Sequence, residues 1–246
     1  NFPRNHDEWN LLKLPHDTLE HAREYFGPDD DSSWLFGRGH RLRLADLYAG
    51  DHDRIAMAHS LLLSYPGTPV VLSGDEIGMG ADLDLPERES VRTPMQWDDS
   101  QNAGFSEADP AELYNPVVDE GQFSYEHVNV ASQTDDPASL LSRVRRLVAA
   151  RQRHPELTDA SFHIADSGHH DVFVHRLDTD DTAFLFAHNF APDYREPVLQ
   201  WEVPDADTTR VVGDGGFHVE DGGVTFLLDP RDYVWLHADK ATECSR

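Results

Sequence analysis

The first residues whose side chains could bind a ligand or take part in a reaction lie near the start of the chain, in the string Asn5-His6-Asp7. A carboxylate beside an imidazole can accept from and donate to neighbouring hydroxyl groups, so the pair suits a polyol such as a sugar. The competing interpretation is an ordinary solvated loop. The chemistry that this string could carry is hydrogen bonding to a neutral, polyhydroxylated ligand.

Four more candidate residues follow in a region rich in Gly, Pro and Asp. Asp75 and Glu76 form an adjacent carboxylate pair, which could carry protons or only organise its loop. Trp97 and Phe105 could stack on sugar faces or pack that loop. A His-rich stretch near residues 163–175 matches no zinc spacing, so we expect no metal and no cofactor.

The elements that must position these residues begin with a helix. Asp51 or Asp53 can cap it, its apolar residues follow helical spacing, and Pro66-Gly67 ends it. The apolar run 70–72 then predicts a buried parallel strand that opens into a loop. Helix, turn, strand and loop form a unit of an α/β barrel or a doubly wound sheet.

A second helix is predicted from Asp136 and Pro137 to Arg151, with its arginines on a salt-paired solvent face. Residues 75–136 have no sustained periodicity, which is typical of a functional loop region. From residue 161, eight short apolar runs separated by turns predict an antiparallel β-sandwich. We therefore expect two domains, residues 1–157 and 158–246.

The charge balance excludes some partners. The chain has 246 residues and a formal net charge of −26, so we expect neither nucleic acid nor an anionic membrane as a partner. Its only lysines are Lys13 and Lys240, a composition that resembles proteins of salt-accumulating cytoplasms. The alternative is an acidic mesophilic protein. With one cysteine and no apolar stretch of about 20 residues, a cytoplasmic protein is expected.

Several strings occur in one order along the chain. They are Asn5-His6-Asp7-Glu8, Pro66-Gly67-Thr68-Pro69-Val70-Val71, Gly74-Asp75-Glu76-Ile77-Gly78-Met79-Gly80, Val91-Arg92-Thr93-Pro94-Met95-Gln96-Trp97 and Asn102-Ala103-Gly104-Phe105-Ser106. Together they resemble the C-terminal half of the α-amylase superfamily, glycoside hydrolase family 13. Within that family they most resemble the trehalose synthases, a resemblance that Glu8 and Gly80 favour.

The resemblance implies a fold: strands seven and eight of a (β/α)8 TIM barrel followed by an all-β C-terminal sandwich domain. Asn5-His6-Asp7 would follow strand seven, and residues 70–72 would be strand eight. By the same resemblance, Asp7 binds hydroxyls of the glucosyl ring and stabilises the transition state, while His6 and Asn5 bind substrate. Arg92 resembles a pocket arginine that pairs with a carboxylate, although a purely structural ion pair is the alternative.

The resemblance also shows what this segment lacks. Retaining glucosyl transfer needs a nucleophile and an acid/base carboxylate roughly 5 Å apart. In the family both precede the segment that matches Asn5-His6-Asp7, so neither position exists here. Arg176-Leu177-Asp178 has the letters of the nucleophile string but follows Asp7 instead of preceding it. We therefore expect the C-terminal portion of a longer polypeptide or of a split enzyme, inactive when alone.

The expected enzyme interconverts maltose and trehalose by way of a glucosyl-enzyme and bound glucose. Its small-molecule partners would be those three sugars, and its protein partner the missing N-terminal part of the barrel. One alternative is a hydrolase of the α-glucosidase or α-amylase type. Another is a catalytically inert or carbohydrate-binding fragment.

Overall fold

The computed structural model describes residues 1–3, 5–7, 9–26, 34–37, 39–200, 208–220 and 222–240. Glu8, which supported the resemblance, lies outside the described residues, as do Cys244 and residues 201–203 of one predicted strand. Within the described residues, every helix is too short or too polar to span a bilayer.

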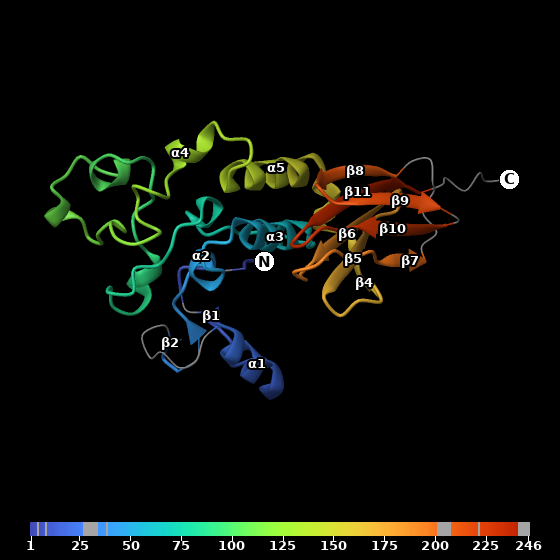
Figure 1. Ribbon diagram of the computed structural model, residues 1–246, viewed down its shortest axis with the longest axis horizontal. Coiled ribbons are helices and arrows are strands. Elements are labelled where there is room, and N and C mark those ends of the chain that lie inside the picture. The colour runs from blue at the N-terminus through green and yellow to red at the C-terminus, as the bar shows by residue number, and fades with distance from the viewer. Residues whose placement is uncertain are drawn as a thin grey trace. The chain divides into compact units, whose positions relative to one another are not determined.

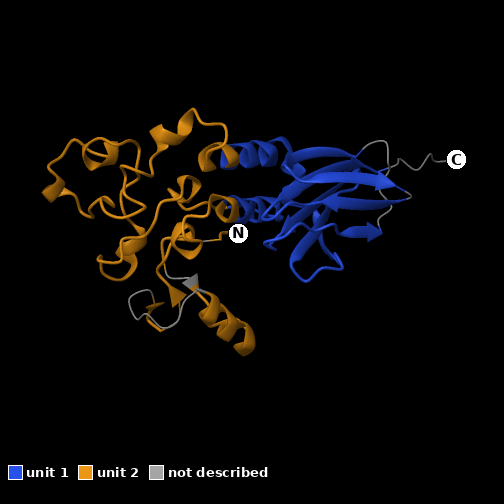
Figure 2. Cartoon of the chain, viewed as in Figure 1, with its two compact units in different colours: residues 1, 56–69, 144–246 blue, residues 2–55, 70–143 orange. Residues whose placement is uncertain are grey.

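The chain forms two compact units (Figure 2). Unit 1 comprises residue 1 with residues 56–69 and 144–246, and unit 2 comprises residues 2–55 and 70–143. The predicted domain boundary between residues 157 and 158 lies inside unit 1 and stays a prediction.

Unit 1 contains two antiparallel sheets, one with the strand order β4-β5-β6-β11-β8 and one with the order β7-β10-β9 (Figure 1). Each of the eight predicted runs coincides with one of these strands, wholly or in its described part. They are β4 (Ser161–Ala165), β5 (Val172–Asp178), β6 (Thr182–Asn189), β7 (Val198–Gln200), β8 (Thr209–Gly213), β9 (Gly216–Glu220), β10 (Gly223–Leu227) and β11 (Tyr233–Asp239).

The two sheets share one hydrophobic core. Val174 and Ala187 of the larger sheet and Val224 and Phe226 of the smaller sheet are fully buried in the same cluster. In β10 buried positions alternate with half-buried ones, as the period of two in a strand requires. β6 is buried from Ala183 to Asn189, which means that both of its faces are covered.

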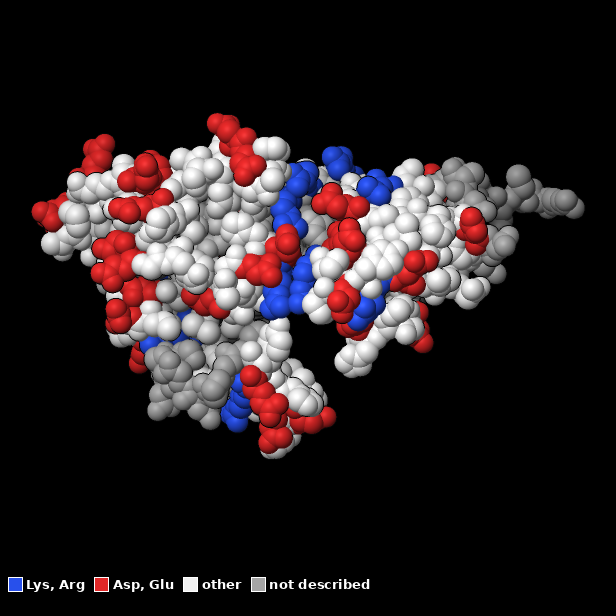
Figure 3. All heavy atoms as spheres, viewed as in Figure 1, with Lys and Arg blue, Asp and Glu red and all other residues white. Residues whose placement is uncertain are grey.

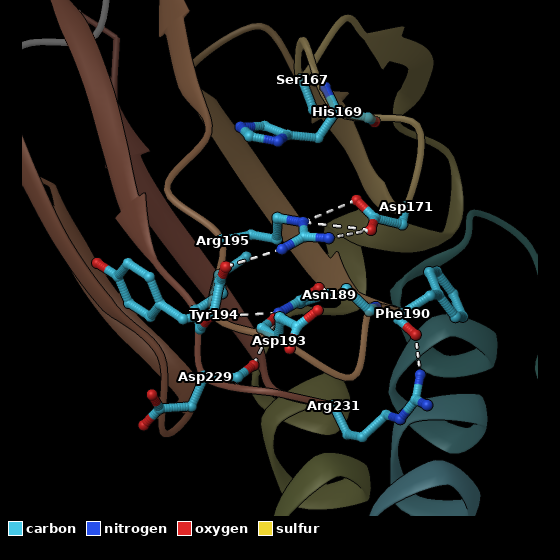
Figure 4. Close-up of polar contacts among 12 residues, drawn as sticks. Ser167, His169, Asp171, Asn189, Phe190, Asp193, Tyr194, Arg195, Asp229 and Arg231 are labelled. Atoms are coloured by element: carbon cyan, nitrogen blue, oxygen red, sulfur yellow. Dashed lines mark hydrogen bonds and ion pairs between the residues drawn. The ribbon is translucent and has the colours of Figure 1, made fainter.

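Polar side chains connect the loops at one end of the sheets (Figure 4). Asn189 is fully buried, and its Nδ2 donates to the carbonyl oxygens of Asp193, Leu228 and Asp229 at 2.9, 3.2 and 2.9 Å. Arg195 Nη2 donates to Asp171 Oδ2 at 2.6 Å. These contacts connect the loop that precedes β5 and the loops that follow β6 and β10.

Helix α3 (His52–Ser64) is capped at its start by Asp51 and is held at its end by a buried polar side chain. The helix starts beside Asp51, whose Oδ1 accepts from the amide of Asp53 at 3.0 Å, so Asp51 is the cap. The expectation that Arg151 lies on a solvent face is wrong. Arg151 is buried, and it donates to the carbonyl oxygens of Leu63 and Tyr65 at 3.2 and 2.9 Å. A helix leaves its last carbonyls unpaired, and the guanidinium satisfies them.

Helix α5 (Leu140–Arg153) begins later than Pro137. Asp136 Oδ1 accepts from the amide of Ala138 at 2.8 Å, and the hydroxyls of Ser139 and Ser142 donate to its carbonyl oxygen. These bonds hold a turn in front of the helix. The 3-10 helix η5 (Pro155–Thr158) follows α5.

Two histidines are buried between β5, β6 and helix α3 within unit 1. The His175 and His188 rings stack with centroids 5.8 Å apart, and both are fully buried. His175 Nε2 donates to the Ser64 carbonyl at 3.2 Å, while Ser60 Oγ lies 2.9 Å from His188 Nε2 and accepts from Trp235 Nε1 at 2.8 Å. Burial lowers the pKa of His175 to about 4 and that of His188 well below 6.5.

Replacing His175 by Phe is expected to flatten the loss of stability in acid. The unfolded chain takes up the proton below about pH 6.5 but the folded chain does not, so His175 costs stability as the pH falls from 6.5 to about 4. At pH 5 this amounts to about 2 kcal/mol. Urea unfolding at pH 7.5 and 5 measures it, with His170→Phe, at an exposed histidine, as the control. Equal pH dependence in the wild type and His175→Phe would contradict the assignment.

Unit 2 consists of short elements joined by long loops. A small antiparallel sheet has the order β1-β3-β2. The elements are β1 (Trp9–Asn10), α1 (His16–Phe26), β2 (Trp34–Leu35), β3 (Gly39–His40), α2 (Leu44–Leu47), η1 (Asp75–Ile77), η2 (Glu87–Val91), η3 (Gln101–Gly104), η4 (Pro110–Glu112) and α4 (Val130–Thr134). The predicted loop region thus holds only 3-10 turns and one short helix.

Residues 70–72 do not form the predicted buried strand. They have no strand assignment, and Val70 is 51% exposed. A strand is stabilised by pairing with a neighbour, and the described residues place none beside this run. Residues 66–68, which precede this run, contact Asn1: the Asn1 backbone nitrogen donates to the Thr68 carbonyl at 2.8 Å, and Asn1 Nδ2 donates to the Pro66 carbonyl at 2.6 Å.

Candidate active site

Asp7 lies in a cluster of ion pairs within unit 2. Its Oδ1 accepts from Arg92 Nη2 at 3.0 Å and lies 3.4 Å from Arg88 Nε. Asn5 Oδ1 accepts from the Asp7 amide at 3.0 Å, and Arg92 Nε donates to the His6 carbonyl at 3.0 Å. The His6 side chain is exposed. The structure therefore brings together the four predicted residues Asn5, His6, Asp7 and Arg92, although 85 positions separate Asp7 from Arg92.

The ion pairs of this cluster orient the Asp7 carboxylate but contribute little to the stability of the fold. The side chains of Arg92 and Asp7 are 35% and 39% exposed. At such exposure water screens an ion pair, whose contribution to folding is about 0–1 kcal/mol. The two guanidinium groups instead hold one carboxylate oxygen in place. A carboxylate held this way can accept from sugar hydroxyls and stabilise developing positive charge.

Sequence reasoning missed two further members of the cluster. Glu89 Oε1 accepts from Arg92 Nη1 at 3.1 Å, and Glu89 Oε2 accepts from Asn115 Nδ2 at 2.8 Å. The spacing of Glu89 and Arg92, three residues apart, is a recognisable signal for a side-chain pair. Asn115 lies in an irregular loop, where no spacing could have indicated its partner.

Asp75 and Glu76 take part in the local structure of their loop. Asp75 is 1% exposed and its Oδ1 accepts from Arg43 Nη1 at 3.1 Å. Glu76 Oε2 accepts from the Gly74 amide at 2.7 Å. Gly74 has a φ of 96°, which side chains other than hydrogen disfavour, and a Cβ there would lie 2.8 Å from Arg43 Nη1, so this position needs glycine. These contacts favour loop organisation over proton transfer, and a role in lining the pocket stays a prediction.

Arg43 is a third residue that the sequence did not reveal. It is 2% exposed, and its Nη2 donates to the carbonyl oxygens of Ser73 and Val91 at 2.8 and 3.2 Å. The guanidinium thereby connects the loop of Asp75 to the residue that precedes Arg92. A buried arginine of this kind supports the segment that carries the Asp7 cluster.

Trp97 and Phe105 lie at the ends of one tight loop. The Trp97 amide donates to the Ala103 carbonyl at 2.8 Å, and Asn102 Nδ2 donates to the Ser106 carbonyl at 2.9 Å. The two aromatic side chains are 49% and 52% exposed. Their faces are accessible for stacking, while a contact with sugar stays a prediction.

The Arg176-Leu177-Asp178 string lies on β5, where residues two apart share a face. Arg176 Nη2 forms an ion pair with Asp178 Oδ1, which also lies 3.2 Å from Lys240 Nζ. These groups line a cleft of about 660 Å³ in unit 1. The string therefore belongs to an ion-pair cluster on a strand of the β-rich region, and its having no nucleophilic role stays a prediction.

Among the described residues, no three His, Cys, Asp or Glu side chains are placed to hold a metal ion. His175, one of the histidines of the His-rich stretch, is instead packed between aromatic rings, with the Phe186 ring centroid 4.7 Å away.

The catalytic-domain family "Alpha amylase, catalytic domain" matches residues 8–160, more than half of the chain. The chain belongs to the α-amylase family. Its solved structural neighbours agree with that fold: trehalulose synthase MutB of Pseudomonas mesoacidophila, at 22% identity, has a TM-score of 0.61 over 98% of this chain and 43% of its own.

Within the α-amylase family the chain is similar to trehalose synthases, as expected. Trehalose synthase/amylase TreS of Mycolicibacterium smegmatis is 42% identical over 163 residues, which cover 65% of this chain and 27% of the relative. Trehalose synthase of Thermus thermophilus is 43% identical over 156 residues, covering 63% of this chain and 16% of the relative. The chain thus matches less than a third of the length of either relative.

Proposed function

We propose that this chain is the C-terminal segment of a retaining enzyme that interconverts maltose and trehalose. The observation that carries the proposal is the contact between Asp7 and Arg92, within a chain 42% identical to a trehalose synthase over 163 residues. Asn5, His6 and Arg92 would bind the glucosyl ring, and Asp7 would stabilise its positive transition state.

The same proposal gives unit 2 its place in the fold. Asn5-His6-Asp7 would follow barrel strand seven, residues 70–72 would become strand eight, and the two sheets of unit 1 would form the C-terminal sandwich domain. The contacts of Asn1 with Pro66 and Thr68 support this arrangement. They bring the residues before Asn5-His6-Asp7 next to the residues before the run 70–72. The remaining strands would supply the pairing that residues 70–72 lack.

In the proposed reaction the nucleophile and the acid/base come from outside this segment. The nucleophilic carboxylate displaces glucose from maltose and forms a β-glucosyl-enzyme, while the acid/base protonates the leaving oxygen. The glucose stays in the pocket and attacks through its anomeric hydroxyl, which gives trehalose and regenerates both carboxylates. Asp7 acts at both transition states, because each has an oxocarbenium-like ring. Attack by water instead gives hydrolysis.

We call this chain together with the segment that carries those two carboxylates the completed enzyme. The test is to incubate maltose with the 246-residue chain alone and with the completed enzyme, and to separate the sugars by chromatography. The chain alone is expected to leave maltose unchanged, and the completed enzyme to form trehalose. Glucose as the sole product would favour the α-glucosidase alternative. No product from the completed enzyme would favour the inert-fragment alternative.

We also propose that the acidic composition is an adaptation to salt in a cytoplasm. Figure 3 shows Asp and Glu side chains spread over the visible face, with Lys and Arg at fewer places. The thermal midpoint of the chain, followed by circular dichroism, is expected to rise as KCl is raised from tens of millimolar to molar. The reason is that the screening length falls from about 10 Å at 0.1 M to about 3 Å at 1 M. A midpoint independent of salt would point to the mesophilic alternative.

A further inference from the structure

The guanidinium group of Arg92 is held on three sides. Its Nε donates to the His6 carbonyl at 3.0 Å, its Nη1 to Glu89 Oε1 at 3.1 Å and its Nη2 to Asp7 Oδ1 at 3.0 Å. Because the five N–H groups of arginine form a rigid planar fork, the direction of one donor fixes the others. The carboxylate of Glu89 therefore determines how Arg92 meets Asp7.

Glu89 is in turn held by Asn115. Asn115 Nδ2 donates to Glu89 Oε2 at 2.8 Å and to the Arg92 carbonyl at 3.2 Å, and the residue is 9% exposed. Glu89 lies in the 3-10 helix η2 and Arg92 directly follows it, with the Arg92 amide donating to the Glu89 carbonyl at 2.9 Å. Side chains three residues apart eclipse one another in a 3-10 helix, which brings Glu89 beside Arg92.

The solvent exposure of the Glu89 and Arg92 side chains indicates whether their contacts serve stability or orientation. The side chains of Glu89 and Arg92 are 23% and 35% exposed, so solvent screens the pair and its contribution to folding is small. Yet three segments of the chain converge to orient a single guanidinium on Asp7. Arg88 Nε also lies 3.4 Å from Asp7 Oδ1, so this carboxylate oxygen contacts two cations. Glu89 is the additional group that orients one of them, Arg92.

We propose that Glu89 and Asn115 are positioning residues that hold Arg92, and through it Asp7, in the geometry that glucosyl transfer requires; this rests on the proposed function. Neither residue touches Asp7 in any contact named above. Their effect on the reaction is through the direction of the Arg92 fork, and misplacement of a reacting group by about 1 Å lowers a rate by up to about a hundredfold.

The first arm of the test is structural and needs no activity. In the 246-residue chain, NMR follows exchange of the Arg92 Nε–H proton with water for the wild type, Glu89→Ala and Asn115→Ala. Both variants are expected to accelerate the exchange several-fold, because the side chain loses its anchor. Glu87→Gln is the matched control, since this exposed residue of the same 3-10 helix loses its charge without touching Arg92. Unchanged exchange in Glu89→Ala overturns the proposal.

The second arm measures kcat and KM for maltose in the completed enzyme. Glu89→Ala is expected to lower kcat about tenfold to a hundredfold with little change in KM, and Glu89→Gln, which keeps an acceptor oxygen, to lower it less. Faster exchange with an unchanged kcat would overturn the positioning role. A wild-type completed enzyme that makes no trehalose would count against the proposed function, and the positioning role of Glu89 in glucosyl transfer would be rejected with it.

Discussion

Replacing Asp7 by Asn in the completed enzyme is expected to lower kcat/KM for maltose by about a thousandfold or more. The amide keeps the size of the side chain but removes the negative charge that stabilises an oxocarbenium-like ring. It also places an uncharged group against Arg92 Nη2 and Arg88 Nε. The loss is therefore expected in kcat as well as in kcat/KM, which steady-state kinetics with maltose measures.

The fold should not change in this variant. Asp7 is 39% exposed, so its ion pairs contribute little to stability, and the circular dichroism spectrum is expected to match that of the wild type. Asp17→Asn makes the same chemical change on the exposed helix α1 and is expected to retain full activity. If Asp7→Asn kept more than a tenth of the wild-type kcat, Asp7 would have no part in the transition state.

Replacing Asp75 by Ala is expected to lower the free energy of unfolding by about 3–5 kcal/mol. Arg43 and Asp75 are 2% and 1% exposed, and removal of the carboxylate leaves the buried guanidinium without its ion-pair partner, bonded to the carbonyl oxygens of Ser73 and Val91. Urea unfolding of the 246-residue chain measures the change. Because Arg43 also holds the Val91 carbonyl, the same variant of the completed enzyme should lose activity as the segment of Arg92 loosens.

Two comparisons isolate the buried charge as the cause. Asp53→Ala removes the ion pair between Arg143 and the side chain of Asp53, which is 61% exposed. This variant is expected to lower the free energy of unfolding by less than about 1 kcal/mol. The double variant Arg43→Met/Asp75→Leu removes both charges and is expected to be more stable than Asp75→Ala alone. If Asp75→Ala were no less stable than Asp53→Ala, burial of this pair would have no energetic consequence.

The β-rich part of the fold was predictable because its signals are local. Alternating apolar residues and Gly- or Asp-rich turns indicated every strand from β4 to β11. The predicted strand 70–72 needs a neighbouring strand to pair with, and a local sequence pattern does not tell whether one is present. In the structure Val70 is exposed. Arg151 was misplaced for a similar reason: an arginine on a helix usually faces water, and only the tertiary structure brings it to the end of α3.

The candidate site was predictable only where its residues stand in recognisable strings. Asn5, Asp7 and Arg92 were found in this way, and their mutual contacts agree with a common site. Asn115 and Arg43 were missed because they act through hydrogen bonds to residues far away along the chain, such as Glu89 and Asp75, which are 26 and 32 positions away. Such pairs have no periodicity, so a sequence alone does not reveal them.

We propose that this chain contributes Asp7 to a pocket that converts maltose into trehalose. The most direct measurement places this chain in the Mycolicibacterium smegmatis trehalose synthase, in exchange for the segment that it matches, and follows maltose by ¹³C NMR. The chimera is expected to form trehalose, and its Asp7→Asn variant is expected to form none at a detectable rate. A folded chimera that yields only glucose, or an Asp7→Asn chimera that still makes trehalose, would contradict the claim.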